Sequence, residues 1–382
     1  MASMRKSATM LDRIRILGAG FTKGEFELYN FDRLSSPELA TGFLSHKEND
    51  QVFRRILNGT HQKFILEDKW VTQGFLDKCG LPVPFAYGLY HPQFGRSYDG
   101  EGLCEEKDFA RVFAAFGSKK VVFKPRGGRQ GRHIVVAKIV LDDQKKAIAV
   151  ERKGERISLS NFLAELPDDA SKHYGGGYHG WIVQGYIEQH ESVSRIYPGT
   201  VNTVRLVTFL SSENKVDYHF AIIRLGRDGQ LADNWSAGGI SVDIDLNCGI
   251  LGKGILKPKY GGRVLSEHPN SGVRFCGLQL PFWGEILNIC ANAALQFSGV
   301  RSIGWDIAIS KNGPLIVEAN AEWDLAMVQA HSSRGYLNPE VRSELSKFGA
   351  TFTDRLPTVT QALFRLGKRR FLSSRFGKYL LS

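Results

Sequence analysis

The chain has 382 residues, of which 42% are hydrophobic, so it can bury a sizeable core, and its length favours two or three domains. Its 50 Lys and Arg residues against 39 Asp and Glu give a net charge of +11, which favours anionic partners such as nucleotides, nucleic acid, acidic glycans or anionic lipid. No apolar run reaches the roughly 18 residues of a membrane span, no secretory signal is recognisable, and the five cysteines form no Cys-x-x-Cys pair, so we expect a cytoplasmic protein without a zinc site or disulfide framework.

The first part of the chain has the pattern of helices joined by loops. Residues 1 to about 60 fit this pattern, and Ser36 is placed to cap a helix that begins at the following proline. A second helical pattern begins at Glu67 and is ended by Gly80. We therefore expect a mainly helical N-terminal region over residues 1–115.

Short β-branched runs follow, separated by glycine-rich turns. They are centred on residues 121–123, 134–136 and 181–183. This texture predicts a small β-rich subdomain over residues 116–190.

Longer strands dominate the next part of the chain. Residues 202–210, 218–225 and 239–244 predict an antiparallel sheet, because their connections are too short for crossover helices. Residues 281–297 have one apolar side and predict a helix. The strands 304–310 and 314–320 are joined through an Asn-Gly turn, which is a strong hairpin signal. Together these elements predict a large subdomain over residues 191–335.

The remaining residues, 336–382, form a basic and predominantly helical tail. From Gln361 onward it contains six Lys or Arg and no acidic residue, with Leu and Phe interleaved. Such a segment could dock on a membrane surface, or it could be a helix packed on the body of the protein with a solvated basic face. Because no nucleic-acid recognition motif accompanies the charge, we expect no nucleic-acid partner.

A glycine-rich loop between two predicted strands is the first candidate site. It spans residues 123–134, and Lys124 stands at the end of the strand that enters it. Gly127, Gly128 and Gly131 would let backbone N–H groups approach phosphate oxygens. The loop is not a Walker A sequence. It suits a polyphosphate, and an ordinary tight hairpin is the alternative.

Oxygen-bearing side chains on the predicted hairpin form the second candidate site. Glu318 and Asn320 are two residues apart and share a face of one strand, and the turn brings Asp306 back beside them. Two carboxylates and an amide oxygen are ligands that Mg²⁺ takes alongside phosphate oxygens. Between the two sites, residues 183–191 form an apolar strand with an acidic exit, which could hold adenine and ribose or be a plain linker.

The order of these elements resembles the ATP-grasp superfamily, and within it the sugar-transfer-associated ATP-grasp proteins, which are related to the glutamate ligase type. The resemblance runs from about Ser45 to Gln329, and its most specific stretches are residues 198–205, 233–240 and 304–320. It implies an α+β fold in which two lobes enclose ATP, behind a helical N-terminal region.

The resemblance also implies roles for individual residues. Lys69 and Lys124 would contact the α- and β-phosphates under the loop of Gly127, Gly128 and Gly131. The adenine would be held by Gln184, Tyr186 and Ile187, and the ribose by Glu191, with Glu188 as the competitor. The transferred phosphoryl group would be handled by Arg205, Arg224, Asn234, Gly238 and Gly239. Two magnesium ions would be bound by Asp306, Glu318 and Asn320.

The implied reaction transfers the γ-phosphoryl group of ATP to a carboxylate and lets an amine, or less commonly a thiol, attack the acyl phosphate. Such transfer depends on cations that neutralise the charge on the moving oxygens. The partners would be a small carboxylate and a small amine, in polysaccharide or sugar-conjugate biosynthesis. Many relatives carry an arginine two residues before the first metal-binding Asp, which stabilises the tetrahedral oxyanion. This chain has Gly304 there, and Arg301 and Arg224 are the candidates to replace that arginine. A phosphotransferase acting on a hydroxyl and a non-catalytic ATP-binding scaffold are the alternatives.

Overall fold

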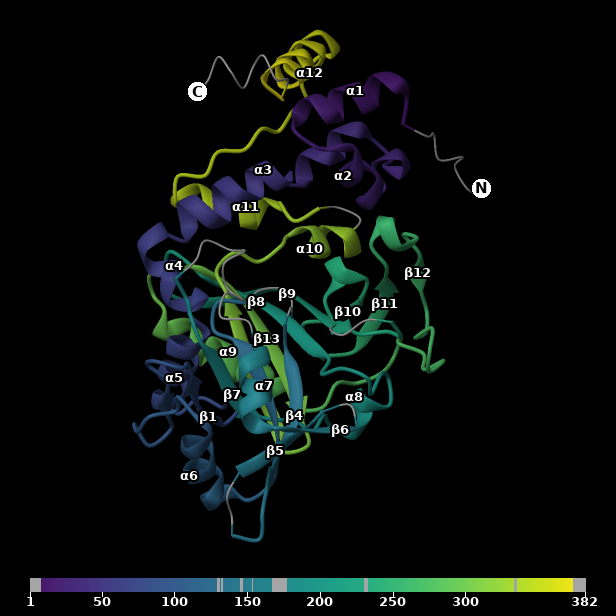
Figure 1. Cartoon of the computed structure of the whole chain (residues 1–382). Helices are drawn as coiled ribbons and strands as arrows, with labels where there is room; N and C mark the ends of the chain where they lie inside the picture. Colours follow the sequence, from purple (N-terminus) through teal and green to yellow (C-terminus); the bar gives the residue numbers. More distant parts are fainter. Residues whose placement is uncertain are drawn as a thin grey trace.

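The computed structural model describes residues 8–128, 131, 133–144, 147–152, 154–166, 177–229, 233–332 and 335–373. Two seven-stranded sheets form its centre, and helices from both ends of the chain cover one side (Figure 1). The predicted α+β class is confirmed. Arg129, Gln130 and Arg132 of the glycine-rich loop and residues 374–382 of the predicted tail lie outside the described residues.

The first sheet has the strand order β2-β1-β7-β3-β4-β5-β6, and each neighbouring pair is antiparallel. Its apolar face packs against α6 and α7 around Phe109, Phe123 and Phe162, which are fully buried. Two strands, β1 and β2, come from the region predicted as mainly helical. The bounds are β1 (Ala86–Tyr90), β2 (Arg96–Ser97), α6 (Glu106–Phe116), β3 (Lys119–Pro125), β4 (Val135–Leu141), β5 (Ala147–Arg152), β6 (Glu155–Ser158), α7 (Leu159–Glu165) and β7 (Trp181–Gly185).

The second sheet has the order β12-β11-β10-β9-β8-β13-β14. The predicted antiparallel pairing of β8, β9 and β10 is confirmed, as is the helix that follows them, α9. The bounds are α8 (Glu191–Ser194), β8 (Thr203–Leu210), β9 (Val216–Leu225), β10 (Ile240–Ile244), β11 (Leu251–Ile255), β12 (Val264–Leu265), α9 (Trp283–Gln296), β13 (Ser302–Ser310) and β14 (Gly313–Asn320).

Alternation along the central strands divides the second sheet into two different faces. Val204, Leu206 and Trp305 belong to the core cluster that also contains the buried side of α9. Residues of the opposite parity, such as Val207 and Phe209, belong to a second cluster under the N- and C-terminal segments. Because successive side chains of a strand point to opposite faces, the polar residues Thr203 and Arg205 of β8 share the second face.

The hairpin of β13 and β14 is confirmed in the predicted place. Ser310 pairs with Gly313, so Lys311 and Asn312 form the turn. Gly313 has φ of 129°, in the range that favours glycine. The hairpin sets the register in which Asp306 lies opposite Glu318 and Gly304 lies opposite Asn320.

Helices from the two ends of the chain pack together. A Cβ on Gly18 of α1 would lie 2.4 Å from the Cβ of Ala362 in α12, and Arg369 donates a hydrogen bond to Leu17 O. Figure 1 shows these two helices side by side at one end of the molecule. The bounds are α1 (Met10–Ala19), α2 (Lys23–Leu28), α3 (His46–Asn49), a π-helix (Asp50–Leu57), α4 (Thr60–Glu67), α5 (Lys69–Lys78), α10 (Ala326–His331), α11 (Pro339–Lys347) and α12 (Val359–Ser373).

The last helix therefore follows the second of the two interpretations of the tail, in which it packs on the body. Part of its apolar surface is still uncovered, since Leu363 is 53% and Phe364 is 74% exposed. Among the described residues, no helix is long and apolar enough to cross a membrane.

Candidate active site

A cavity of about 650 Å³ is lined by residues of both sheets and of the N-terminal region. The first sheet contributes Lys124 and Gln184, and the second contributes Arg205, Asp306 and Glu318. The cavity therefore brings together residues that are far apart in the sequence.

A charged row crosses three strands of the second sheet. The register places Glu318 of β14 opposite Asp306 of β13, and Asp306 opposite Arg205 of β8. Directly opposed residues of an antiparallel pair project from the same face. The alternation and the register together aim all three side chains at the cavity.

Two arginines hold the carboxylate of Asp306. Arg205 Nε lies 2.6 Å from Asp306 Oδ1 and Arg205 Nη2 lies 3.0 Å from Oδ2, which is a bidentate pair. Arg224 Nη2, from β9, lies 3.0 Å from the same Oδ2. Asp306 is 3% exposed. Burial acts to raise the pKa of its carboxyl group, but the two guanidinium groups outweigh burial and hold the pKa below its ordinary value.

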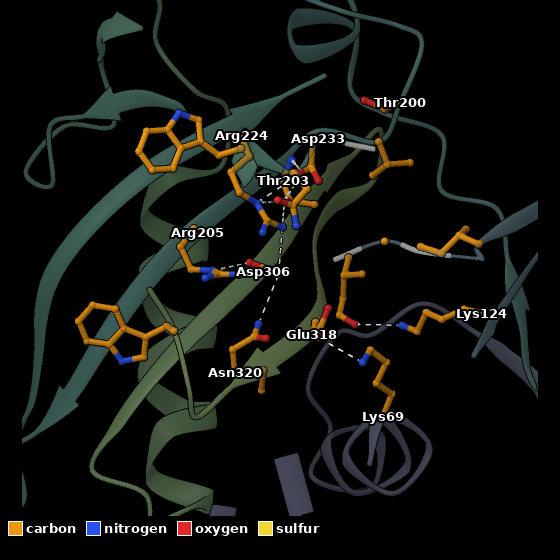
Figure 2. A pocket seen from close by; sticks show the side chains of 18 of the residues that line it. Lys69, Lys124, Thr200, Thr203, Arg205, Arg224, Asp233, Asp306, Glu318 and Asn320 are labelled. Carbon is orange, nitrogen blue, oxygen red and sulfur yellow. Dashed lines mark hydrogen bonds and ion pairs between the residues drawn. The ribbon is translucent and has the colours of Figure 1, made fainter. Parts of the chain in front are cut away.

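Asp233 holds the second arginine from the other side. Its Oδ2 accepts hydrogen bonds from Thr203 N at 3.0 Å and Thr203 Oγ1 at 2.5 Å, and lies 3.6 Å from Arg224 Nε. Arg224 also donates to Thr203 Oγ1, at 2.6 Å from Nη2. Figure 2 shows Asp233, Thr203 and Arg224 as one group beside Asp306. Our sequence prediction gave Asp233 no role, although it stands inside the quoted stretch 233–240.

Two ammonium groups approach the Glu318 end of the charged row from the other side of the cavity. Lys69 Nζ lies 3.3 Å from Glu318 Oε1, and Lys124 Nζ donates to Val317 O at 3.3 Å. In Figure 2 both lysines point toward β14, and the arginines lie on the far side of Asp306. Burial, with the repulsion of Lys69, lowers the pKa of Lys124 to about 8, although Glu318 and Asp306 oppose that shift.

The start of the glycine-rich loop is fixed to the start of α5. Arg126 Nε and Nη2 lie 2.9 Å and 2.5 Å from the two carboxylate oxygens of Asp68, which also caps α5 through Trp70 N and Val71 N. Gly127 and Gly131 line the cavity. Gly128 does not line it, but its carbonyl oxygen accepts a hydrogen bond from Lys69 Nζ.

The predicted adenine residues lie together at the β7 end of the cavity. Gln184, Tyr186 and Ile187 line it, and the Oε1 atom of Gln184 is buried without a hydrogen-bond partner. Lys120 Nζ lies 3.6 Å from the centre of the Tyr186 ring. The predicted ribose residues do not line the cavity: Glu191 begins α8, and Glu188 pairs with Lys311 on the surface.

The loop that carries the predicted Asn234, Gly238 and Gly239 borders the cavity only in part. Asn234 lines it and caps a short 3₁₀ turn by accepting from Ser236 N at 2.8 Å. Gly238 has φ of 110°, and a Cβ on Gly239 would lie 2.5 Å from Asp233 O. The two glycines therefore allow the loop to place Asp233, and they do not face the cavity themselves.

Gly304, the position at which many relatives carry an arginine, has no room for that side chain. A Cβ on Gly304 would lie 2.7 Å from the Cβ of Trp323 and 3.2 Å from Arg205 Cδ. Of the two proposed substitutes, Arg224 is in the cavity. Arg301 is not: it donates to Ser211 O and Asn214 Oδ1, so the suggestion that it substitutes is wrong.

Asp306, Glu318 and Asn320 fit a magnesium ion by the chemistry of their donors. Two carboxylates and an amide lie on one face of the hairpin, and the Asn320 amide nitrogen faces Gly304 O and Asp306 Oδ2 at 3.3 and 3.4 Å. The amide oxygen is then the Asn320 atom that could bind a metal. Hard oxygen donors with room for phosphate oxygens suit Mg²⁺. In the described part of the chain, no group of three or more His, Cys, Asp or Glu residues is arranged to hold a metal ion, so an ion here would need the Asn320 oxygen and phosphate oxygens as further ligands.

Further cavity residues come from segments that sequence patterns did not single out. His46 and Arg54 reach the cavity from α3 and the π-helix, and Glu322, Trp323 and Asp324 from the segment after β14. None of them stands in a short motif with a known mechanism. Their meeting depends on how the N-terminal region packs on the second sheet, which local sequence does not reveal.

Comparison with known proteins gives a family match over most of the chain. Residues 48–343 match the family model described as sugar-transfer associated ATP-grasp. No curated protein matches the sequence. Similar solved structures include biotin carboxylase from Campylobacter jejuni (14% identity, TM-score 0.42, 74% of this chain and 49% of that one). Another is an L-amino acid ligase from Bacillus licheniformis (12% identity, TM-score 0.35, 70% and 43%). The chain spans about half the length of the first solved structures it matches.

Proposed function

This chain belongs to the sugar-transfer associated ATP-grasp family, and on that basis we propose that it is a Mg-ATP-dependent ligase that joins a carboxylate to an amine or a thiol through an acyl phosphate. We place the reaction in polysaccharide or sugar-conjugate biosynthesis. The observation that carries the proposal is the cavity in which Lys69 and Lys124 face the row of Glu318, Asp306 and Arg205.

The adenine end of the cavity favours a base that donates a hydrogen bond. Gln184 Oε1 is buried without a partner, and an unsatisfied buried acceptor costs about 1–3 kcal/mol. If the Gln184 side chain turns this oxygen toward the cavity, the exocyclic amino group of adenine would satisfy it, whereas a carbonyl at the same place would not. Val122, Val136 and Ile187 supply apolar surface around that position.

Lys69 and Lys124 would bind the phosphates of ATP and hold them against the second sheet. Both ammonium groups lie near Glu318, so a metal bound there would share the phosphate oxygens. Asp306, Glu318 and Asn320 would hold Mg²⁺, which when bound neutralises phosphate charge and orients the γ-phosphate. We propose two ions, as the resemblance implies, with Glu318 as the shared ligand.

Arg205 and Arg224 would stabilise the charge that develops during transfer. The substrate carboxylate attacks the γ-phosphorus, the bond to the β,γ-bridging oxygen breaks, and ADP leaves with that electron pair. The amine then attacks the acyl carbon, the bond to the phosphate oxygen breaks, and the departing phosphate can take the proton of the amine. Fixed guanidinium groups in a buried site stabilise such charge without reorganisation. Asp306 and Asp233 hold both arginines in place.

Trapping of the acyl phosphate tests this proposal. The protein would be incubated with Mg-ATP, hydroxylamine and a panel of carboxylic acids, and acyl hydroxamate and ADP would be measured by mass spectrometry. We expect hydroxamate with at least one acid and none without ATP. ADP formation with no hydroxamate from any acid would contradict the ligase assignment.

A phosphotransferase acting on a hydroxyl is the second candidate, and Gly304 is the observation that favours it. Without an arginine at that position, one group that stabilises a tetrahedral oxyanion in many ligases is absent, and phosphoryl transfer to a hydroxyl does not need it. A stable phosphorylated product formed without any amine would select this candidate. ATP binding without turnover of any substrate would select the non-catalytic scaffold.

We also propose that the C-terminal helix touches an anionic membrane surface. Leu363 and Phe364 are 53% and 74% exposed, and Arg365 and Lys368 follow them on the same helix. Exposed apolar side chains with basic neighbours favour anionic lipid. Sedimentation with vesicles that contain phosphatidylglycerol should carry down the protein, and Phe364→Ser should reduce that fraction. Equal sedimentation with purely zwitterionic vesicles would contradict the proposal.

A further inference from the structure

Two residues that line the cavity each carry a buried polar atom without a partner. Among the described residues, three side-chain N or O atoms are buried with no hydrogen-bond partner: Gln184 Oε1, Arg54 Nε and Asn49 Oδ1. Gln184 and Arg54 line the same cavity, one from the first sheet and the other from the π-helix of the N-terminal region. The buried Arg54 Nε does not open onto the cavity, so the groups that Arg54 can offer to a bound molecule are its two Nη amino groups.

The other contacts of the Arg54 guanidinium are long. Its Nη1 lies 3.6 Å from Asp50 Oδ1, and its Nη2 lies 3.5 Å from the main-chain oxygen of Glu322. Asp50 is shared with Arg55, whose Nε is closer, at 3.0 Å. A charge-assisted N–H···O bond is normally about 2.7–2.9 Å long, so Arg54 keeps unused donor capacity where it faces the cavity.

The surroundings of Arg54 leave its positive charge poorly compensated. In the segment after β14, the carboxylate of Glu322 pairs with Lys63 at 2.6 Å, and the main-chain oxygen of Glu322 lies 3.5 Å from Arg54 Nη2. Asp50 is divided between two arginines. An anion entering the cavity at this point would therefore meet a guanidinium whose carboxylate partner, Asp50, is shared with a second arginine.

Arg54 lies within reach of the proposed metal site. Glu322 follows Asn320 by two residues, and two residues of chain span at most about 7 Å. The residue before Arg54, Phe53, packs on Trp323 with ring centroids 4.8 Å apart, and Trp323 abuts Gly304 beside Asn320. One small molecule can thus touch both the guanidinium and the region of the transferred phosphoryl group.

We propose that Arg54 forms an anion-binding subsite for a substrate other than ATP, and that this substrate carries a carboxylate or a phosphate ester at this position. Trp235, Trp323 and Met327, which line the same cavity, would border the uncharged part of that molecule. The inference rests on the proposed function for what occupies the rest of the cavity. The subsite makes the substrate an anionic small molecule, and it selects against neutral analogues because they bring no negative charge to the guanidinium.

Three ligands built on one sugar ring test the subsite: D-glucose, D-glucuronate and D-glucose 6-phosphate. Each would be titrated calorimetrically into the full-length protein, both saturated with Mg-AMPPNP and without nucleotide. We expect at least one of the two anions to bind the wild-type protein and glucose to bind at least tenfold more weakly. The tighter of the two anions identifies the group as carboxylate or phosphate ester.

Arg54→Met and Arg55→Met form a matched pair of variants. Both arginines contact Asp50, but the side chain of Arg55 is 76% exposed and is not part of the cavity lining. We expect Arg54→Met to weaken anion binding at least tenfold, Arg55→Met to leave it unchanged, and Arg54→Lys to restore part of it because the charge returns without the fork.

Two results would overturn the subsite: equal anion affinity in Arg54→Met and wild type, or no binding of either anion to the wild type. Affinity for Mg-AMPPNP, measured separately, should be the same in all variants. If the wild-type protein does not bind Mg-AMPPNP, the proposed function is refuted. The titrations without nucleotide would still show whether Arg54 binds the anion. Urea unfolding of Arg54→Met and Arg54→Lys identifies any loss of folding.

Discussion

Asp306→Asn tests the charged network at the centre of the candidate site. The carboxylate accepts two hydrogen bonds from Arg205, at 2.6 and 3.0 Å, and lies 3.0 Å from Arg224. The side chains of the two arginines are only 8% and 11% exposed. Removing one partner of a buried ion pair leaves the others uncompensated, at a cost of about 3–5 kcal/mol. Because asparagine keeps an oxygen that can accept one bond, we expect a loss of about 3 kcal/mol in the free energy of unfolding.

Urea unfolding followed by tryptophan fluorescence measures this loss. Asp243→Asn is the matched control, because Asp243 lies on β10 of the same sheet and burial raises the pKa of its carboxyl group. Removing a charge that the fold does not stabilise should change the free energy of unfolding by less than about 0.5 kcal/mol. If Asp306→Asn unfolds at the same urea concentration as wild type, the argument that Asp306 neutralises both arginines is refuted.

Three further predictions concern ATP. Glu318→Gln should lower turnover by about 100-fold or more, because the amide loses the charge that would bind the metal. It should cost under about 1 kcal/mol in the free energy of unfolding, because the Glu318–Lys69 pair is 3.3 Å long and partly exposed. Normal turnover would contradict the metal assignment. Because the pKa of Lys124 is about 8 and bound phosphate raises it, the contribution of Lys124 predicts that ATP affinity measured by calorimetry weakens as the pH rises above about 8. In Lys124→Arg this pH dependence should vanish, and its persistence would assign it to another group. Gln184→Met should raise the free energy of unfolding of the nucleotide-free protein by about 1 kcal/mol, since it removes an unsatisfied buried acceptor. The same variant should bind ATP more weakly. Tighter ATP binding would contradict the adenine assignment.

Local sequence patterns predicted the second sheet better than the first. The strands 202–210, 218–225 and 239–244 were located within two residues, because each is a β-branched run between clear turns. The Asn-Gly turn also fixed the register of the last hairpin. β1 and β2 were not predicted, because both are short. β1 joins the first sheet only by pairing with β7, which lies about ninety residues later in the chain, and β2 joins it only through β1.

The candidate site could be predicted only as far as single strands reach. Alternation showed that Glu318 and Asn320 share a face, but the pairing of Asp306 with Arg205 depends on how β13 aligns with β8, about a hundred residues away. Glu191 is a residue that the local pattern suggested for the site and that lies outside the cavity. It looked like the acidic end of a strand, yet the strand stops at Gly185 and Glu191 begins a short helix that does not line the cavity.

The two lysines of the candidate site are positioned by one acidic residue that no motif contains. Asp68 caps α5 immediately before Lys69, and its carboxylate also holds Arg126, two residues after Lys124. Lys69 N and Arg126 O lie 3.4 Å apart, so the main chains of the two segments also meet. A negative charge so close to the proposed phosphate site would repel ATP if it were unpaired. Its bidentate pairing with Arg126 removes that objection, and it fixes the spacing of two ammonium groups that come from a helix and from a separate sheet. The same carboxylate therefore caps the helix, pairs with Arg126 and fixes the residues proposed to contact phosphate, so the start of α5 belongs to the candidate site as much as the glycine-rich loop does.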